Sequence, residues 1–80
     1  MNTPKFVRVE YSDESLGGIN RNEFEAELHD ALKERFPGSL VNIVCGINDR
    51  YFGEDGSGNE LDAEEIRRVS EEVFANICRN

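Results

Sequence analysis

Basic residues are scarce in this 80-residue chain. Lysine and arginine together number 9, against 17 aspartates and glutamates, so the formal net charge is −8 and the pI is about 4.5. Proteins that bind nucleic-acid phosphates need a basic face, so we expect no direct nucleic-acid binding. Apolar runs are also short: none reaches the roughly 20 residues of a membrane-spanning helix, and the start of the chain lacks the apolar stretch of a signal peptide. We therefore expect a cytoplasmic protein without membrane contact.

Histidine and cysteine, the residues that most often carry nucleophilic and metal chemistry, are scarce as well. The one histidine, His29, falls on the polar flank of a predicted helix, where we expect an exposed side chain with no catalytic role. The two cysteines, Cys45 and Cys78, occupy apolar positions and are expected to be reduced, small buried side chains. A zinc site would need clustered cysteine and histidine, which the chain lacks.

Ligand-binding motifs are missing too. The run 55–59 (DGSGN) begins like a calcium loop, but Glu60 and Ile66 stand where the glycine and the bidentate glutamate are required. No phosphate loop or dinucleotide glycine motif is present. Carboxylates are so frequent that no pair stands out as an acid–base site. We expect no enzyme, no metal and no cofactor.

The first half of the chain predicts a strand, a helix and a second strand. Residues 6–11 alternate apolar and polar side chains, which is typical of a half-buried strand, and 12–18 reads as a loop. Asn20 followed by Glu23 is a capping-box pattern, and Pro37 ends the helix that it opens. That helix carries one apolar stripe: Phe24, Leu28, Ala31, Leu32 and Phe36.

The second half repeats part of this pattern. The apolar, β-branched run 40–47 suits a strand that is buried more than the first one, and we expect it at the centre of the sheet. A short strand at 50–52 would pair back on it as a hairpin, and 54–60 is a glycine-rich loop. Asp62 and Glu65 form a second capping box. The last helix then carries its own apolar stripe: Ile66, Val69, Val73, Phe74 and Ile77.

The order strand, helix, strand, strand, helix predicts the architecture. Two amphipathic helices and a small sheet can bury their apolar faces only against each other. We expect a single α+β domain over residues 1–80, a two-layer βαββα sandwich. Its small three-stranded mixed sheet would carry both helices on one face, and the crossover through the first helix would make the first two strands parallel.

The negative charge is concentrated. Residues 49–65 hold seven acids and one base, so they contribute −6 of the net −8. In the last helix, a spacing of seven residues aligns two pairs of acids along the axis: Glu64 with Glu71, and Glu65 with Glu72. Two interpretations stay open. The acids form either a solvated face that the helix needs anyway, or a surface for a basic partner.

The chain resembles the DinI family of bacterial DNA-damage-response proteins. The resemblance lies in the order of elements and in three short segments: the strand 6–10 (FVRVE), the helix end 35–37 (RFP) and the helix segment 66–74 (IRRVSEEVF). It implies a βαββα fold without enzymatic activity that binds a RecA-type recombinase or its filament and modulates the SOS response. The positions that match the family's contact face are Glu64, Glu65, Glu71 and Glu72.

These observations lead to two functional hypotheses. The first is a non-enzymatic regulator that binds RecA through the acidic face of its last helix. The alternative is a small self-associating accessory module, of phage or mobile-element origin, that uses Tyr51 and Phe52 to self-associate and binds a different basic protein. The sequence leaves the oligomeric state open and favours a monomer.

Overall fold

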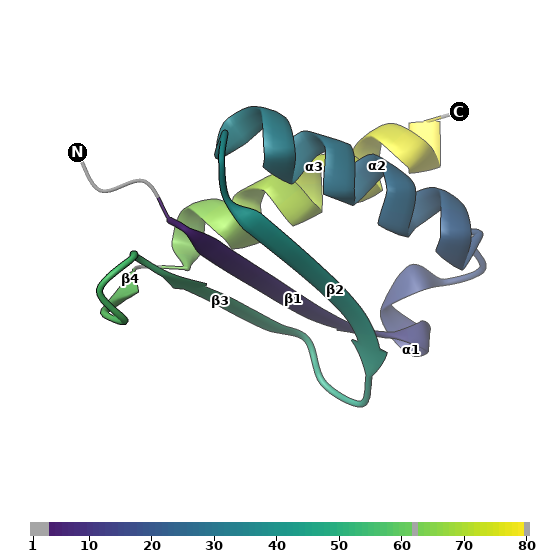
Figure 1. The fold of residues 1–80 in the computed structure, drawn as a ribbon. Coiled ribbons are helices and arrows are strands. Elements are labelled where there is room, and N and C mark those ends of the chain that lie inside the picture. Colours follow the sequence, from purple (N-terminus) through teal and green to yellow (C-terminus); the bar gives the residue numbers. More distant parts are fainter. Residues whose placement is uncertain (1–3, 62, 80) are drawn as a thin grey trace.

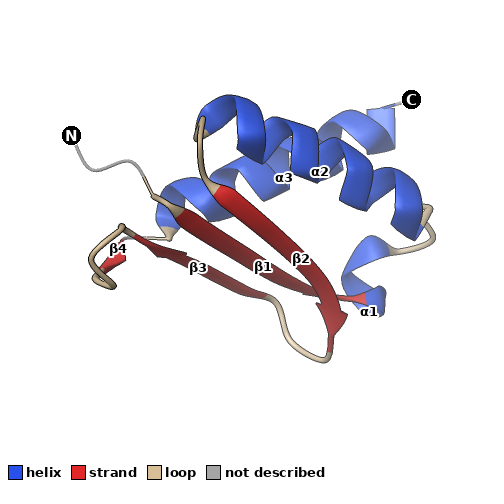
Figure 2. Ribbon diagram, in the orientation of Figure 1, coloured by secondary structure: helices blue, strands red, loops and turns tan. Residues whose placement is uncertain are grey.

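A four-stranded mixed sheet organises the chain, and the computed structural model describes residues 4–61 and 63–79. In chain order the elements are β1 (Phe6–Ser12), α1 (Asp13–Leu16), α2 (Arg21–Arg35), β2 (Leu40–Gly46), β3 (Arg50–Glu54), β4 (Glu60–Leu61) and α3 (Glu64–Arg79). The sheet order is β2-β1-β3-β4, with β2 parallel to β1 and the other pairs antiparallel. The two long helices, α2 and α3, cover one face of the sheet and leave the other bare (Figures 1 and 2). The predicted α+β sandwich is therefore confirmed.

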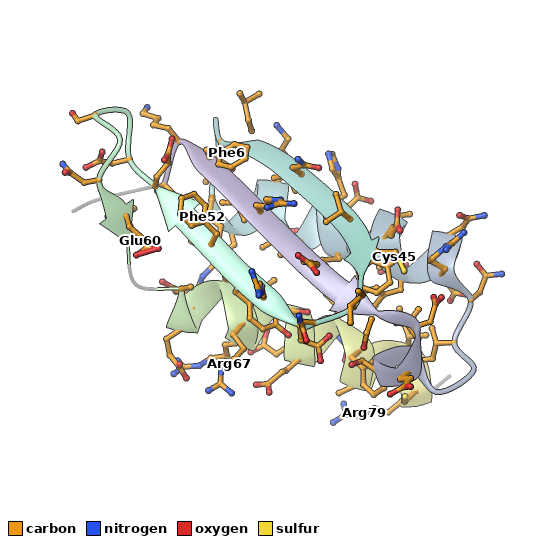
Figure 3. The ribbon with its side chains drawn as sticks, turned by 90° about the horizontal axis from the view of Figure 1, so that it is seen from below. Phe6, Cys45, Phe52, Glu60, Arg67 and Arg79 are labelled. Carbon is orange, nitrogen blue, oxygen red and sulfur yellow. The ribbon has the colours of Figure 1, made fainter. Side chains whose placement is uncertain are left out.

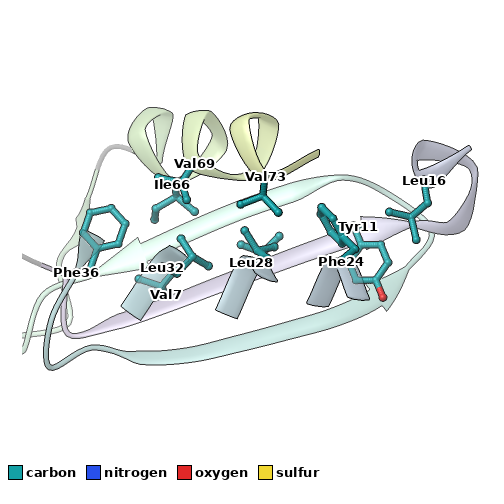
Figure 4. Packing of buried hydrophobic residues seen from close by; sticks show 11 residues of the cluster. Val7, Tyr11, Leu16, Phe24, Leu28, Leu32, Phe36, Ile66, Val69 and Val73 are labelled. Atoms are coloured by element: carbon teal, nitrogen blue, oxygen red, sulfur yellow. The ribbon is translucent and has the colours of Figure 1, made fainter. Parts of the chain in front are cut away.

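The core lies between the two helices and the central strand β1. Val7 and Val9 of β1 are fully buried because their side chains point toward the helices. Both predicted helical stripes contribute, and most of their members are buried: Phe24, Leu28, Leu32, Phe36, Ile66, Val69 and Val73 (Figure 4). Gly53 of β3 allows α3 to come this close, since a Cβ there would lie 2.8 Å from the Cδ1 of Ile66.

The prediction for the strand at 40–47 is wrong in its position. β1 occupies the centre of the sheet, whereas β2 has β1 as its one neighbour and forms an edge. The predicted hairpin is wrong as well, because β3 pairs with the opposite side of β1. Asp49, in the short connection between β2 and β3, accepts hydrogen bonds from the backbone N–H of Ser12 (3.1 Å) and the hydroxyl of Ser15 (2.6 Å). The connection is thereby fixed across the end of β1.

Short elements were missed where the sequence predicted loops. The segment 12–18 contains α1, in which the Ser12 side chain accepts from the backbone N–H of Ser15 and Gly17 closes the helix in the left-handed region (φ 59°). The two-residue β4 lies at the end of the predicted loop 54–60 and adds a fourth strand to the expected three. An element of two or four residues is too short for a periodic pattern to show it.

The helix starts were predicted with more success. The side chain of Asn20 caps α2 by accepting from the backbone N–H of Glu23 at 3.0 Å, as the capping box indicates. The other predicted cap, Asp62, lies outside the described residues. Within residues 4–61 and 63–79, no helix is long and apolar enough to span a membrane.

Candidate functional site: two docking surfaces

Three of the four acids of α3, Glu64, Glu65 and Glu71, form ion pairs with arginines. Arg67 contacts both members of the first pair, with its guanidinium 2.5 Å from the Glu64 carboxylate and 3.7 Å from that of Glu71. Glu65 forms an ion pair with Arg35 of α2 instead. Residues 64 and 65 differ by about 100° around the helix axis, so the two pairs lie on different flanks. Positive and negative side chains therefore alternate on the exposed surface of α3, and this surface is not uniformly negative.

The second pair borders a groove between α2 and α3. This groove has a volume of about 310 Å³ and is lined by Ala31, Glu34, Arg35, Glu65, Arg68, Val69 and Glu72. Three carboxylates and two guanidiniums face the same open space. The ion pair between Arg35 and Glu65 is about half exposed, and an exposed pair contributes at most about 1 kcal/mol. This ion pair therefore matters more for the positions of the two charges on the surface than for stability.

The bare face of the sheet is a second candidate surface, hereafter the open sheet face. Its members are the even-numbered residues of β1 and their cross-strand neighbours. They are Phe6, Arg8 and Glu10 of β1, Leu40, Asn42 and Val44 of β2, Arg50, Phe52 and Glu54 of β3, and Glu60 of β4. Much of this face forms a shallow depression of about 710 Å³.

Two aromatic rings mark the open sheet face. Phe6 and Phe52 are diagonal neighbours, with ring centroids 6.1 Å apart and planes at 63°, and they stand side by side on the strands (Figure 3). Leu40 lies next to Phe6 in the β1–β2 register and is 70% exposed. Arg8 is paired with Phe52 across the strands. Aromatic residues and arginine are both enriched in protein interfaces, so this face is a candidate docking surface.

The open sheet face is not among the predicted sites, although the sequence contains a signal for it. The alternation in residues 6–11 places Phe6 on the face opposite Val7 and Val9, and a large aromatic on a supposedly solvated face is unusual. The same register corrects the predicted use of Tyr51 and Phe52 as one patch. Tyr51 is paired with Val9 and points toward the helices, so the two rings lie on opposite faces of the sheet.

Two tyrosines on the helix side of the sheet serve packing. Tyr11 donates its hydroxyl hydrogen to the Glu25 carboxylate of α2, and burial together with that bond raises its pKa. Burial also raises the pKa of Tyr51, an effect that its hydrogen bond with Ser70 of α3 partly offsets. Both side chains tie a helix to the sheet.

The remaining residues of interest are exposed or locally engaged. His29 is exposed, as predicted, whereas the expectation of buried cysteines is wrong: Cys45 and Cys78 are free and exposed, because one lies on an edge strand and the other near the end of α3. In the loop after β3, one carboxylate oxygen of Asp55 accepts from the backbone N–H groups of Ser57 (2.8 Å) and Asn59 (3.1 Å). These donors lower the pKa of Asp55. Across the described ranges, no three histidine, cysteine or acidic residues stand together as metal ligands.

Comparison with known proteins gives one informative similarity. No family model matches the chain. No solved structure matches it significantly. The chain is 32% identical over 76 residues to Segregation and condensation protein A of Caldanaerobacter subterraneus subsp. tengcongensis. The aligned region covers 95% of this chain and 30% of that protein, so the chain spans less than a third of the relative's length.

This similarity overturns the DinI assignment. The chain is similar along almost its whole length to a Segregation and condensation protein A and not to a DinI-like protein, so the predicted DinI membership, RecA binding and role in the SOS response are wrong. The three segments that suggested DinI describe an alternating strand, a helix stop at proline and an amphipathic helix. Any chain that folds as β1-α2-β2-β3-α3 needs such segments, and they therefore carry no information about a partner.

Proposed function

We propose that this chain is a non-enzymatic protein-interaction module that acts in chromosome segregation and condensation. The observation that supports this role is its 32% identity over 76 residues to a protein of that function. Such a module would work in the cytoplasm. With a net charge of −8 it would act on the chromosome through protein partners.

The open sheet face is the surface that we propose for the main contact. Phe6 and Phe52 are already ordered against each other, so little side-chain entropy remains to be lost on binding. Arg8 stands beside Phe52 and can pair with an acidic or carbonyl group of the partner. When an aromatic or arginine side chain is a hot spot at the centre of an interface, its truncation weakens binding by about 2 kcal/mol or more.

The experiment is a complementation test in cells that lack the gene. We expect deletion to raise the fraction of cells without a nucleoid, as counted by DNA staining, and the wild-type gene to restore it. Phe52→Ala should fail to restore partition, whereas Glu27→Ala, at an exposed position of α2, should restore it. Circular dichroism verifies that both variants fold. Normal partition in the deletion strain would refute the proposed function, and full rescue by Phe52→Ala would refute the surface.

A further inference from the structure

The outer edge of β2 exposes a row of backbone hydrogen-bonding groups. The backbone N–H of Leu40 donates to the carbonyl of Lys5 at 2.8 Å, so Leu40 directs its backbone groups toward β1. Backbone direction alternates along a strand, and Val41, Ile43 and Cys45 therefore direct their N–H and C=O groups away from the sheet. Among the strands that the structure describes, none pairs with this side of β2.

This edge lacks the features that normally prevent edge pairing. β2 has the sequence LVNIVCG, with no charged residue and no proline, in a chain of which 32% is charged. Its register with β1 runs without a bulge from Leu40 to Gly46. Exposed edges are usually protected by charge, proline or bulges. The composition that led sequence analysis to place this strand at the centre of the sheet thus occurs at an edge.

Exposed apolar side chains flank the same strand. Within the described part of the chain, the large hydrophobic residues that stand exposed are Leu40 (70%) and Ile47 (89%). One is the first residue of β2 and the other directly follows its last. Cys45 is exposed near the far end of β2, as Figure 3 shows. Both ends of the strand therefore keep apolar surface in contact with water.

We propose that β2 pairs antiparallel with β2 of a second copy, about a two-fold axis at Ile43. In this register, Ile43 faces its own counterpart, and Val41 faces Cys45 of the second copy. All three residues have outward backbone groups, so each pair can exchange two hydrogen bonds, about six in total. The pairing is self-complementary, as a two-fold interface requires. It joins the two sheets into one, with both pairs of helices on the same face.

Charged side chains of the helices lie beside both ends of the strand. At one end, Lys33 of α2 donates from its Nζ to the carbonyl of Ser39 at 2.7 Å. At the other end, the Asp13 carboxylate of α1 accepts from the thiol of Cys45 at 3.4 Å. Antiparallel pairing brings the first end of one copy to the second end of the other. Arg21 of α2 also interacts with Cys45 and Asp13 at this second end. Lys33 would then approach an end of the second copy that holds both Asp13 and Arg21, and the two-fold axis repeats this arrangement.

The interface is independent of the open sheet face, although it would make the two open faces continuous. If β2 pairs in this way, sedimentation velocity should show a monomer at low protein concentration and a dimer at high concentration. Cys45→Pro removes one outward N–H without touching the ladder to β1, because edge positions with a solvent-facing N–H tolerate proline. We expect Cys45→Pro to raise the dimer dissociation constant at least tenfold, and Cys45→Val, which keeps the N–H, to leave it within a factor of about two to three.

A disulfide test does not depend on that variant. Val41→Cys places a thiol opposite the native Cys45 of the second copy, at the Cα separation that disulfides accept, about 5.5 Å. Oxidation should give a covalent dimer whose peptide map links positions 41 and 45, and the same substitution combined with Cys45→Ser should lose that link. A wild-type chain that stays monomeric at millimolar concentration, a dimer that Cys45→Pro leaves intact, or the absence of the 41–45 link would each overturn the proposal.

Discussion

At the scale of single residues, Tyr11 joins the sheet to a helix through one polar contact. Its ring packs edge-on against Phe24 with centroids 5.2 Å apart, and its hydroxyl donates to Glu25. A phenol that donates a hydrogen bond to a carboxylate must keep its proton, so this contact favours the neutral form of Tyr11. This is why burial and the Glu25 bond both raise the pKa of Tyr11 above its ordinary value of 10.0.

Removal of this hydroxyl should lower stability in a pH-dependent manner. At neutral pH we expect Tyr11→Phe to reduce the free energy of unfolding by about 1 kcal/mol, the usual net value of a hydrogen bond. The folded-state pKa is raised, so the stabilisation is fully present below pH 10.0 and declines as the pH rises above it, where Tyr11 ionises first in the unfolded chain. Urea titrations from pH 7 to 11 should show the difference between the two proteins narrowing. A constant difference would contradict this account.

At the scale of elements, sequence patterns correctly identified the long helices and strands, but they did not predict which strands lie next to one another in the sheet. The stripes of α2 and α3 were found because each buries one face on the sheet, so a period of 3.6 is visible in the chain. The position of β2 could not be found, since an apolar edge strand has the same pattern as a central one. The pairing of β3 with β1 is accompanied by hydrogen bonds from Ser12 and Ser15 to Asp49, which is more than 30 residues away in sequence, and a local pattern does not reveal such contacts.

The same limit applies to the acids of α3. Spacing correctly aligned Glu64 with Glu71 and Glu65 with Glu72, but it could not show that Arg35 of another helix pairs with Glu65. The role of these acids in partner binding stays a prediction. The acids of α3 and the open sheet face lie on different sides of the molecule, so each can be tested as a contact surface independently of the other (Figure 1).

Charge reversal on α3 tests that role. Glu72 borders the groove between α2 and α3. If α3 is a second contact, Glu72→Lys should lower the rescue of chromosome partition by severalfold, because it places a like charge against a basic group of the partner. Glu27→Lys makes the same charge change on α2 and should rescue fully. If both variants rescue equally, the acids of α3 serve only to solvate the exposed face of the helix and do not contact a partner.

At the scale of the whole molecule, the surfaces differ in charge and in chemistry. The helix side carries ion pairs between acids and arginines, and the strand β2 at the edge of the sheet has no charged residue. The open sheet face combines two aromatic rings with arginines. Aromatic rings and arginines on a bare sheet are also the components of a single-stranded nucleic-acid site, in which the bases stack on the rings.

The carboxylates on the open sheet face decide between protein and nucleic acid. Glu10, Glu54 and Glu60 share this face with its arginines, and the whole chain carries −8. Like charge repels phosphates, so we expect no change in the fluorescence anisotropy of a labelled single-stranded oligonucleotide at an ionic strength of about 0.15 M.

A matched variant shows whether those carboxylates are the cause. Replacing Glu10, Glu54 and Glu60 by glutamine removes three negative charges, which changes the formal net charge from −8 to −5 and leaves the rings and arginines in place. We expect this variant to gain weak binding that disappears as salt is raised, since released counterions would then supply the affinity. Binding of the oligonucleotide by the wild-type chain would contradict the proposed protein partner. The absence of binding by both proteins would show that the rings alone, without a net positive surface around them, cannot retain a nucleic acid.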